Sequence, residues 1–599
     1  MSRMSSASLG KMRKISTTTF TSIHPKDENQ ERGNWDNPLE LILTILGYAI
    51  GLGNVWRYPA LCYENGGGAF IIPYLVMLFG CGVPLVMMEM TLGQYSSQGL
   101  LTVWKICPLS KGLGIGMIVM TVLIGVYYNM ITGWSIHFFF MSLRKVLPWH
   151  CCSEPWASER CNSIADTCIN NQLLNISPSI EETGGVQWDL ALVLFVAWLL
   201  IFLVLMKGVK SLGKVVYFST TFPIIVLLSL LIRSLMEDGA VDGIRNYFKP
   251  DWSVLLKGKV WASACSQIFF STGACQGGAI TLSSYNKFKN NLVRDAFILS
   301  LGDCMASLLS GITVFSILGF LANSQNTTIE NVVTSGPGLT FMTYPSAVTM
   351  LPLSTLWSAM FFLMLTNLAL SSMFPITEII ITGITDQVES LRQYKYFVTM
   401  AVCFVNFLLG LLFATNGGMY WLQLFDTYGA GYGLLLLAAT EVIVVCWRYG
   451  GTRLMNNIKS MVNIPRFFVA FKYVWMFVTP VLLGFSLVFT FLGAGVPIEY
   501  PAGVPFPGWA IGVGWFLCFF SFFPVPMYAI YRFVVYKLSD DGKNQSFLQA
   551  LQTMTSPTED WGPATPFNRA IAEKVERRRI VSTTDSVFRR SGLSEDFQR

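Results

Sequence analysis

Charge is scarce in this sequence. Only 13% of the 599 residues are Asp, Glu, Lys or Arg, whereas 53% are hydrophobic. A water-soluble protein of this length could not bury so much apolar surface in its cores. Most of the chain is therefore expected to lie in lipid.

Residues that bind metals or phosphates are few as well. The three histidines, His24, His137 and His150, are not grouped with other plausible ligands. There is no phosphate-binding P-loop and no HExxH motif. The net charge of +6 does not gather on a basic face of a soluble domain, as nucleic-acid binding would require. We expect neither an enzyme nor a nucleic-acid-binding protein.

The apolar residues form about twelve stretches long enough to cross a bilayer. These stretches are 39–62, 70–92, 113–142, 188–207, 213–235, 259–283, 295–322, 353–384, 394–413, 418–447, 470–492 and 509–531. The sequence thus predicts an all-α membrane protein. Its transmembrane domain spans 39–536, between a tail over 1–38 and a tail over 537–599, which we expect to be disordered and solvated.

The basic residues predict the orientation. The first tail is polar and basic, it lacks the apolar core of a cleavable signal, and the alternate loops on its side are rich in Lys and Arg. We expect a multi-pass protein of the plasma membrane with both tails in the cytoplasm. A long loop over about 147–187 would then be extracellular.

The predicted extracellular loop contains several cysteines. Cys152 and Cys161 lie nine positions apart, in an oxidising environment that favours a disulfide. Cys151 and Cys168 are alternative partners.

Two acceptor sequons also fall on the predicted outer face. Asn175 begins Asn-Ile-Ser, and Asn326 begins Asn-Thr-Thr in the loop after the seventh span. We expect both asparagines to carry glycans.

Two spans contain polar, glycine-rich interruptions. The first reads GYAIGLGNVWR over 47–57, and the sixth reads QIFFSTGACQGG over 267–278. Non-helical backbone at mid-membrane is tolerated only where it faces protein, water or ligand, although close packing of helices through small residues is an alternative. Two broken helices five spans apart indicate inverted repeats with a binding site between them. We take spans 1–5 and 6–10 as these repeats.

Five carboxylates lie within the predicted spans, where each is costly unless it lines a cavity or has a partner. They are Glu89, Asp303, Glu378, Asp426 and Glu441. For Glu89 and Glu441, acceptance of hydrogen bonds from broken backbone or a neighbouring helix competes with a direct role in coupling.

The chain resembles the neurotransmitter:sodium symporters in several motifs. These motifs are RGNW at 32–35, GYAIGLGNVWRYP at 47–59, ENGGGAF at 64–70, LGQY at 92–95, YY at 127–128, SYNKF at 284–288 and FD at 425–426. The resemblance covers nearly the whole chain beyond the tails and is strongest to the animal glycine, GABA and betaine carriers. It implies the 5+5 inverted-repeat core of the bacterial leucine transporter. It also implies sodium-coupled, chloride-dependent symport of a small carboxylate-bearing solute by alternating access.

The resemblance implies three ion sites. The first sodium would bind Ala49, Asn54, Ser271 and Asp303. The second would bind the carbonyls of Gly47, Ile50 and Leu368 and the hydroxyls of Ser371 and Ser372. Chloride would lie between Tyr74, Gln267, Ser271 and Ser307, whose hydroxyl and amide donors suit an anion.

Two residues depart from the animal members of the family. Asp303 stands where Asn is usual, one helical turn before Ser307, so we expect its negative charge to replace part of the role of chloride. Ser371 stands where Asp is usual, which is expected to weaken the second sodium site.

The resemblance also implies a substrate pocket. Its residues would be Gly51, Leu52, Gly53, Ile124, Tyr128, Phe270, Gly273 and Gln276. Monoamine carriers place an Asp at the position of Gly51, so glycine there favours a substrate with its own carboxylate. Gln276 occupies the position that sets pocket size, and the pair Cys275-Gln276 is similar to the betaine carrier. Glycine, GABA and betaine therefore all remain candidate substrates.

Charge pairs would close the two ends of the pathway. The resemblance implies Arg57 with Asp426 outside and Arg32 with Asp386 inside, the latter braced by Tyr285 and Trp35. Partly wetted pairs can form and break at little net cost. The rival hypothesis is a receptor-like or channel-like relative that binds the solute without coupled transport.

Overall fold

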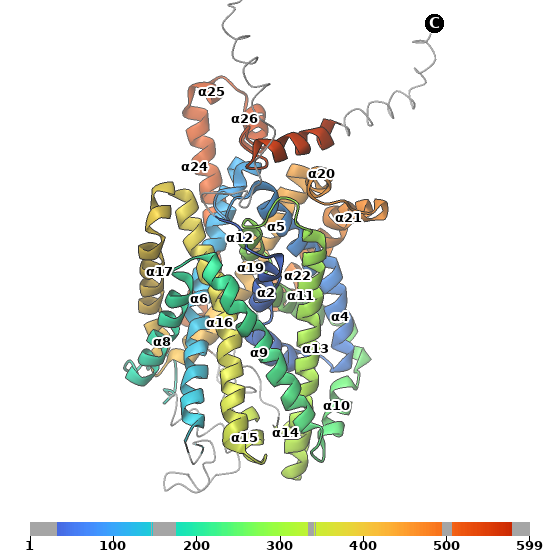
Figure 1. The fold of residues 1–599 in the computed structure, drawn as a ribbon, viewed down its shortest axis with the longest axis vertical. Helices are drawn as coiled ribbons and strands as arrows, with labels where there is room; N and C mark the ends of the chain where they lie inside the picture. Colours follow the sequence, from blue (N-terminus) through green and yellow to red (C-terminus); the bar gives the residue numbers. More distant parts are fainter. Residues whose placement is uncertain are drawn as a thin grey trace, which may run out of the picture.

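Every regular element of the described chain is a helix. The computed structural model describes residues 33–144, 147, 175–332, 341, 343–493 and 506–577. Two isolated β-bridges, Gly67 with Pro250 and Val186 with Thr415, are the only strand-like pairings within these residues. The helices run alongside one another in an elongated bundle (Figure 1). The predicted all-α fold is confirmed.

Nine helical segments of the described residues are long and apolar enough to cross a membrane. They are Gly68–Ser96 (α4 and α5), Pro108–Ser142 (with α6), Trp188–Leu205 (α8), Val209–Ser234 (α9), Leu292–Ser324 (α13), Ser354–Gln387 (α16), Glu389–Ala414 (with α17), Gly418–Met461 (α18 to α20) and Phe468–Gly493 (with α22). Two further spans are bent pairs of helices. Pro38–Ala49 (α2) meets Gly53–Glu64 (ending in α3) at 46°, and Gly508–Phe522 (α23) meets Pro524–Leu538 (α24) at 41°.

The sixth span is broken outright. Gly258–Thr272 (α11) ends at Gly273, and Gly278–Ser283 (α12) begins after Gly277; both glycines have left-handed backbone, with φ of 63° and 82°. Glycine adopts this conformation without steric cost. The nine segments and the two bent pairs make up to eleven candidate spans within the described residues, whereas the sequence predicts about twelve. The first and sixth predicted spans are the interrupted ones, as expected. The bend at Pro524 was not predicted.

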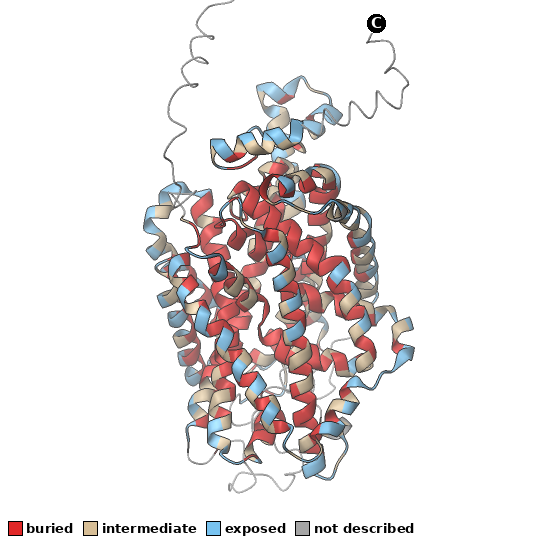
Figure 2. Cartoon of the chain, turned by 45° about the vertical axis from the view of Figure 1, so that its right-hand side comes forward, coloured by how far each residue is buried: buried red, intermediate tan, exposed pale blue. Residues whose placement is uncertain are grey.

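The outer faces of the bundle are apolar. Leu192 and Leu203 on α8, Phe397 and Phe404 on α17, and Ile530 on α24 are all exposed. Buried positions gather in the centre instead (Figure 2). Apolar outer faces of this extent suit lipid, so the chain is a multi-pass membrane protein.

Protein encloses the break in the first span. Helix α2 packs against α9, α13 and α16, and α12 packs against α2, α5 and α16. Helix α6, in turn, runs along α16. Non-helical backbone at membrane depth is therefore shielded from lipid, as it must be.

The chain after the last span is folded in part, contrary to our expectation of a solvated tail. Asp540–Lys543 (α25) and Phe547–Met554 (α26) lie at the end of the bundle that carries α20, opposite α14 (Ile329–Val332) and α15 (Tyr344–Thr349) (Figure 1). Arg448 donates to the Thr555 hydroxyl at 2.6 Å, and the Trp561 ring lies 5.8 Å from that of Tyr95. These contacts dock the segment onto the bundle.

Candidate functional site

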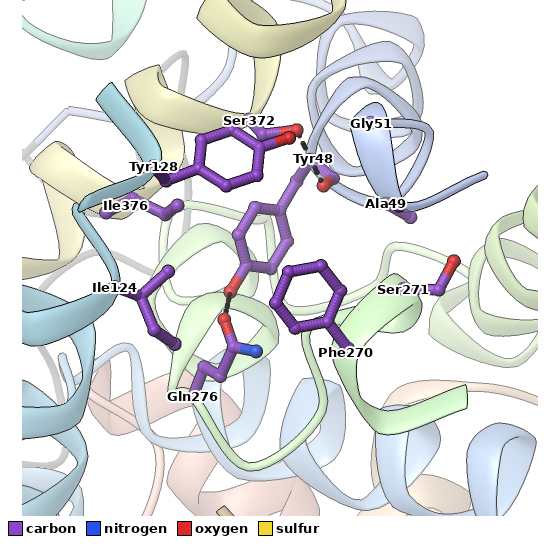
Figure 3. A pocket seen from close by; sticks show the side chains of 11 residues that line it. Tyr48, Ala49, Gly51, Ile124, Tyr128, Phe270, Ser271, Gln276, Ser372 and Ile376 are labelled. Carbon is purple, nitrogen blue, oxygen red and sulfur yellow. Dashed lines mark hydrogen bonds between the residues drawn. The ribbon is translucent and has the colours of Figure 1, made fainter. Parts of the chain in front are cut away.

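A small cavity of about 30 Å³ lies where the first and sixth spans are interrupted. Eleven residues line it: Tyr48, Ala49, Gly51, Gly53, Ile124, Tyr128, Phe270, Ser271, Gln276, Ser372 and Ile376 (Figure 3). Six of the eight predicted substrate residues are among them. Leu52 and Gly273 are the two that do not line the cavity.

Glycine at position 51 keeps part of this site open. A Cβ there would lie 2.6 Å from the Ser372 hydroxyl oxygen and 2.9 Å from that of Tyr128. The Tyr128 hydroxyl accepts a hydrogen bond from the Leu52 N–H at 3.1 Å. Backbone N–H and hydroxyl donors thus converge beside the open position, and such donors suit a carboxylate.

Tyr48 was not predicted to line the cavity. Its ring crosses the space between α2 and the sixth-span break, and its hydroxyl donates to Gln276 Oε1 at 2.9 Å (Figure 3). A Cβ on Gly273 would lie only 2.1 Å from the Tyr48 ring. Gly273 therefore makes room for Tyr48. The signal was present in the sequence, because Tyr48 lies inside the interrupted motif.

The Asn54 side chain contacts two other predicted ligands of the first sodium ion, Ser271 and Asp303. Its side-chain nitrogen donates to Asp303 Oδ1 at 2.7 Å, to the Ser307 hydroxyl at 2.8 Å and to the Ser271 hydroxyl at 3.2 Å. Asp303 is fully buried, and its second oxygen, Oδ2, has no hydrogen-bond partner among the described residues. A buried carboxylate oxygen without a donor suits a hard cation. Ala49 lines the adjoining cavity.

The predicted chloride residues come together only in part. The Tyr74 hydroxyl donates to the Ser307 hydroxyl at 3.2 Å, and Ser307 connects with Ser271 through Asn54. The Gln267 amide nitrogen donates to the Gly53 carbonyl at 3.2 Å, beside Asn54, and no hydrogen bond between Gln267 and the other three residues is present among the described residues.

The predicted second sodium ligands converge between α2 and α16. The Ser372 hydroxyl lies 3.4 Å from the carbonyl oxygens of both Gly47 and Leu368, and the Ser371 hydroxyl donates to the Leu368 carbonyl at 2.8 Å. Ile50 is the C-cap of α2, with φ of −78° and ψ of 88°. Its carbonyl thus lies where the helix ends, as a cation site at a break requires.

The predicted outer pair is present. Arg57 lies 3.9 Å from the Asp426 carboxylate, and its guanidinium lies 4.5 Å above the Phe270 ring. Tyr127, which the sequence did not single out for this place, donates to Asp426 at 2.8 Å. Together these side chains close one end of the cavity.

Some predicted residues are placed elsewhere or cannot be described. Arg32, Cys152 and Cys161 lie outside the described residues, so their pairings stay predictions. Asp386 lies 3.6 Å from Arg392. Asn175 and Asn326 are both exposed, as glycan acceptors must be.

The comparisons with known proteins identify the family. The model of the sodium:neurotransmitter symporter family matches residues 32–536. The chain belongs to the sodium:neurotransmitter symporter family. It is 40% identical to the sodium- and chloride-dependent glycine transporter 1 of Xenopus laevis, over 91% of this chain and 90% of the relative. It is 39% identical to glycine transporter 2 of the same organism, over 91% and 74%, and 38% identical to the mouse neutral and basic amino acid transporter B(0+), over 90% and 91%.

In this symporter, the end of the bundle that the sequence predicts to face the cytoplasm has more contacts than the sequence indicated. The Trp35 indole donates to the Leu282 carbonyl at 3.0 Å. The Tyr285 hydroxyl lies 2.8 Å from that of Thr382 and donates to Glu378 at 3.2 Å. Glu378 is fully buried, and Lys395 pairs with it at 2.7 Å.

We expect Lys395→Ala to open the inner end of the symporter. Removing the cation leaves the buried Glu378 carboxylate unpaired, which costs several kcal/mol. The backbone N–H of Trp35 donates to the Tyr285 carbonyl at 3.2 Å. Hydrogen exchange at this backbone N–H should accelerate at least tenfold in the variant, and uptake should fall. Lys395→Arg keeps the charge and serves as the control. Equal exchange rates in the alanine variant and the wild type would show that the pair does not hold this end closed.

Proposed function

We propose that this symporter couples sodium entry to the uptake of a small amino acid that carries its own carboxylate, with glycine as the leading candidate. The observation that carries the proposal is the open position at Gly51. There the Leu52 N–H and the Tyr128 hydroxyl converge, and a side chain would fill the space.

The proposed ion sites adjoin this position. Asn54 donates to Asp303, and its Oδ1 accepts the Gly51 N–H at 3.0 Å. A sodium ion at the free Asp303 oxygen would thus lie next to a substrate carboxylate at Gly51. Contact between opposite charges couples the two binding events thermodynamically. The second sodium would bind between α2 and α16, where Ser371 in place of Asp weakens it.

The size of the cavity favours a small solute. It measures about 30 Å³, and the Tyr48–Gln276 hydrogen bond crosses it. Glycine, the smallest of the candidate solutes, would need the least rearrangement of this closed space, whereas GABA or betaine would need more. Two of the three relatives described above are named as glycine transporters, which supports the same choice.

Chloride and the orientation belong to the same proposal. Relatives are named as chloride-dependent, and here Ser307 and Tyr74 would supply hydroxyl donors to the anion, with Asp303 replacing part of its role. Both tails would lie in the cytoplasm of a plasma-membrane protein. The disulfide between Cys152 and Cys161 and the glycans on Asn175 and Asn326 would then be extracellular.

An uptake screen tests the proposal. Cells expressing the chain are given radiolabelled glycine, proline, GABA, betaine or taurine in sodium or choline medium, with untransfected cells as the control. We expect glycine to accumulate above its external concentration and accumulation to collapse in choline. Saturable binding without accumulation would instead favour the receptor-like or channel-like alternative.

A further inference from the structure

A second buried cluster lies beside the sixth-span break. Glu89 comes from α5, Cys275 from the break itself and Glu441 from Gly433–Val442 (α19). One ligand atom from each lies within 4.8 Å of the others, and all three residues are fully buried. The proposed transport mechanism uses none of them.

Three of the four carboxylate oxygens in this cluster have no hydrogen-bond partner among the described residues. Glu89 Oε1 accepts a hydrogen bond from the Cys275 backbone N–H. Glu89 Oε2 and both carboxylate oxygens of Glu441 are buried with no hydrogen-bond partner among the described residues. An unpartnered buried carboxylate oxygen costs free energy.

The surroundings of the pair contain no positive charge to balance it. The other titratable groups that face the cluster are Tyr48, Cys81, Cys265 and Cys446, and each is uncharged in its acid form. No Lys, Arg or His of the described chain forms an ion pair with Glu89 or Glu441. Two carboxylates this close cannot both stay ionised in the interior without a bound cation.

We propose that Glu89 and Glu441 bind one proton between them. The proton, taken from water, removes one of the two charges. It also gives one carboxyl an O–H that can donate to an unpartnered oxygen of the other. The pair is then a proton-binding site directly behind Cys275, the neighbour of the cavity residue Gln276.

Loss of this proton would affect the sixth-span break. Two negative charges would lie against the Cys275 backbone, and their repulsion would disfavour the packing of the break between α5 and α19. The consequence for uptake rests on the proposed function, whereas the protonation of the pair does not.

Infrared spectroscopy of the purified protein in lipid tests the site directly. At about neutral pH we expect the C=O stretch of a protonated carboxyl that is lost in Glu441→Gln and in Glu89→Gln. It should persist in Cys275→Ser and in Glu559→Gln, which alters an exposed carboxyl. An identical carboxyl band in Glu441→Gln and wild type would overturn the proposal. The absence of this band in the wild type would overturn it too, because a bound metal or sodium ion would then keep both carboxylates ionised.

Uptake gives a second, separate readout. The wild type should lose uptake as the pH rises and the pair deprotonates. Glu441→Gln, whose neutral amide also donates a hydrogen bond, should keep its uptake to a pH about one unit higher. If uptake by this variant falls at the same high pH as uptake by the wild type, the proposed link between the proton and transport is contradicted. If no tested solute is taken up, the infrared band still decides whether the proton is bound.

Discussion

Uptake of the carboxylate substrate should fall to background in Gly51→Asp. The new side chain would occupy the space beside the Tyr128 and Ser372 hydroxyls, and its charge would lie beside the substrate carboxylate. Two like charges about 4 Å apart repel by about 4 kcal/mol at an effective dielectric constant of about 20, which corresponds to roughly a thousandfold loss of affinity. Radiolabelled glycine uptake, normalised to surface expression, measures the effect.

Gly185→Asp is the matched control for this variant. Position 185 is exposed in a loop, and no atom lies within 4 Å of a Cβ added there. The same substitution at that position should leave uptake within twofold of the wild type. Undiminished uptake in Gly51→Asp would place the substrate elsewhere.

Asp303→Asn should make transport strongly dependent on chloride. Asp303 Oδ1 and the Ser307 hydroxyl oxygen bind the same amide nitrogen of Asn54, so the carboxylate lies close to the proposed anion position. A negative charge fixed there disfavours chloride and supplies part of what chloride would contribute. Replacing chloride with gluconate should lower wild-type uptake only about twofold and uptake by the variant at least about tenfold.

The sodium dependence of the same variant provides an internal check. Removing the carboxylate that faces the proposed sodium position should raise the sodium concentration needed for half-maximal uptake. Ser307→Ala in the Asp303→Asn background should abolish the acquired chloride dependence. Equal chloride dependence in Asp303→Asn and wild type would mean that Asp303 does not act as the counter-charge.

The sequence was sufficient to predict the spans and the two breaks, because apolar length and glycine content are local signals. The residues around Asn54 were also named, because the family resemblance implies Ser271, Asp303 and Ser307 as ion-site residues. Contacts between distant segments were not predictable in this way. Tyr48 and Gln276 are 228 positions apart; the sequence places their segments at one site but does not show that these two side chains form a hydrogen bond.

Two further misses have the same physical origin. Lys395 begins α17, at the edge of the predicted span 394–413, and its sequence context does not indicate that it pairs with Glu378. The polar segment after the last span resembled a solvated tail, yet Arg448 and Tyr95 supply contacts that fold it against the bundle. In both cases the partner residue lies in another part of the sequence, so the local composition does not reveal the contact.

The two ends of the pathway differ in how firmly they are closed, and this difference bears on the resting population of states. At the outer end the Arg57–Asp426 distance is 3.9 Å, and the two side chains are 21% and 36% exposed. At the inner end a fully buried Glu378 lies 2.7 Å from Lys395. Each additional 1.4 kcal/mol of stabilisation of the closed inner end raises the population of the outward-open state about tenfold. With the orientation proposed above, most substrate-free molecules should therefore have the cavity open to the extracellular solution, where the solute would bind.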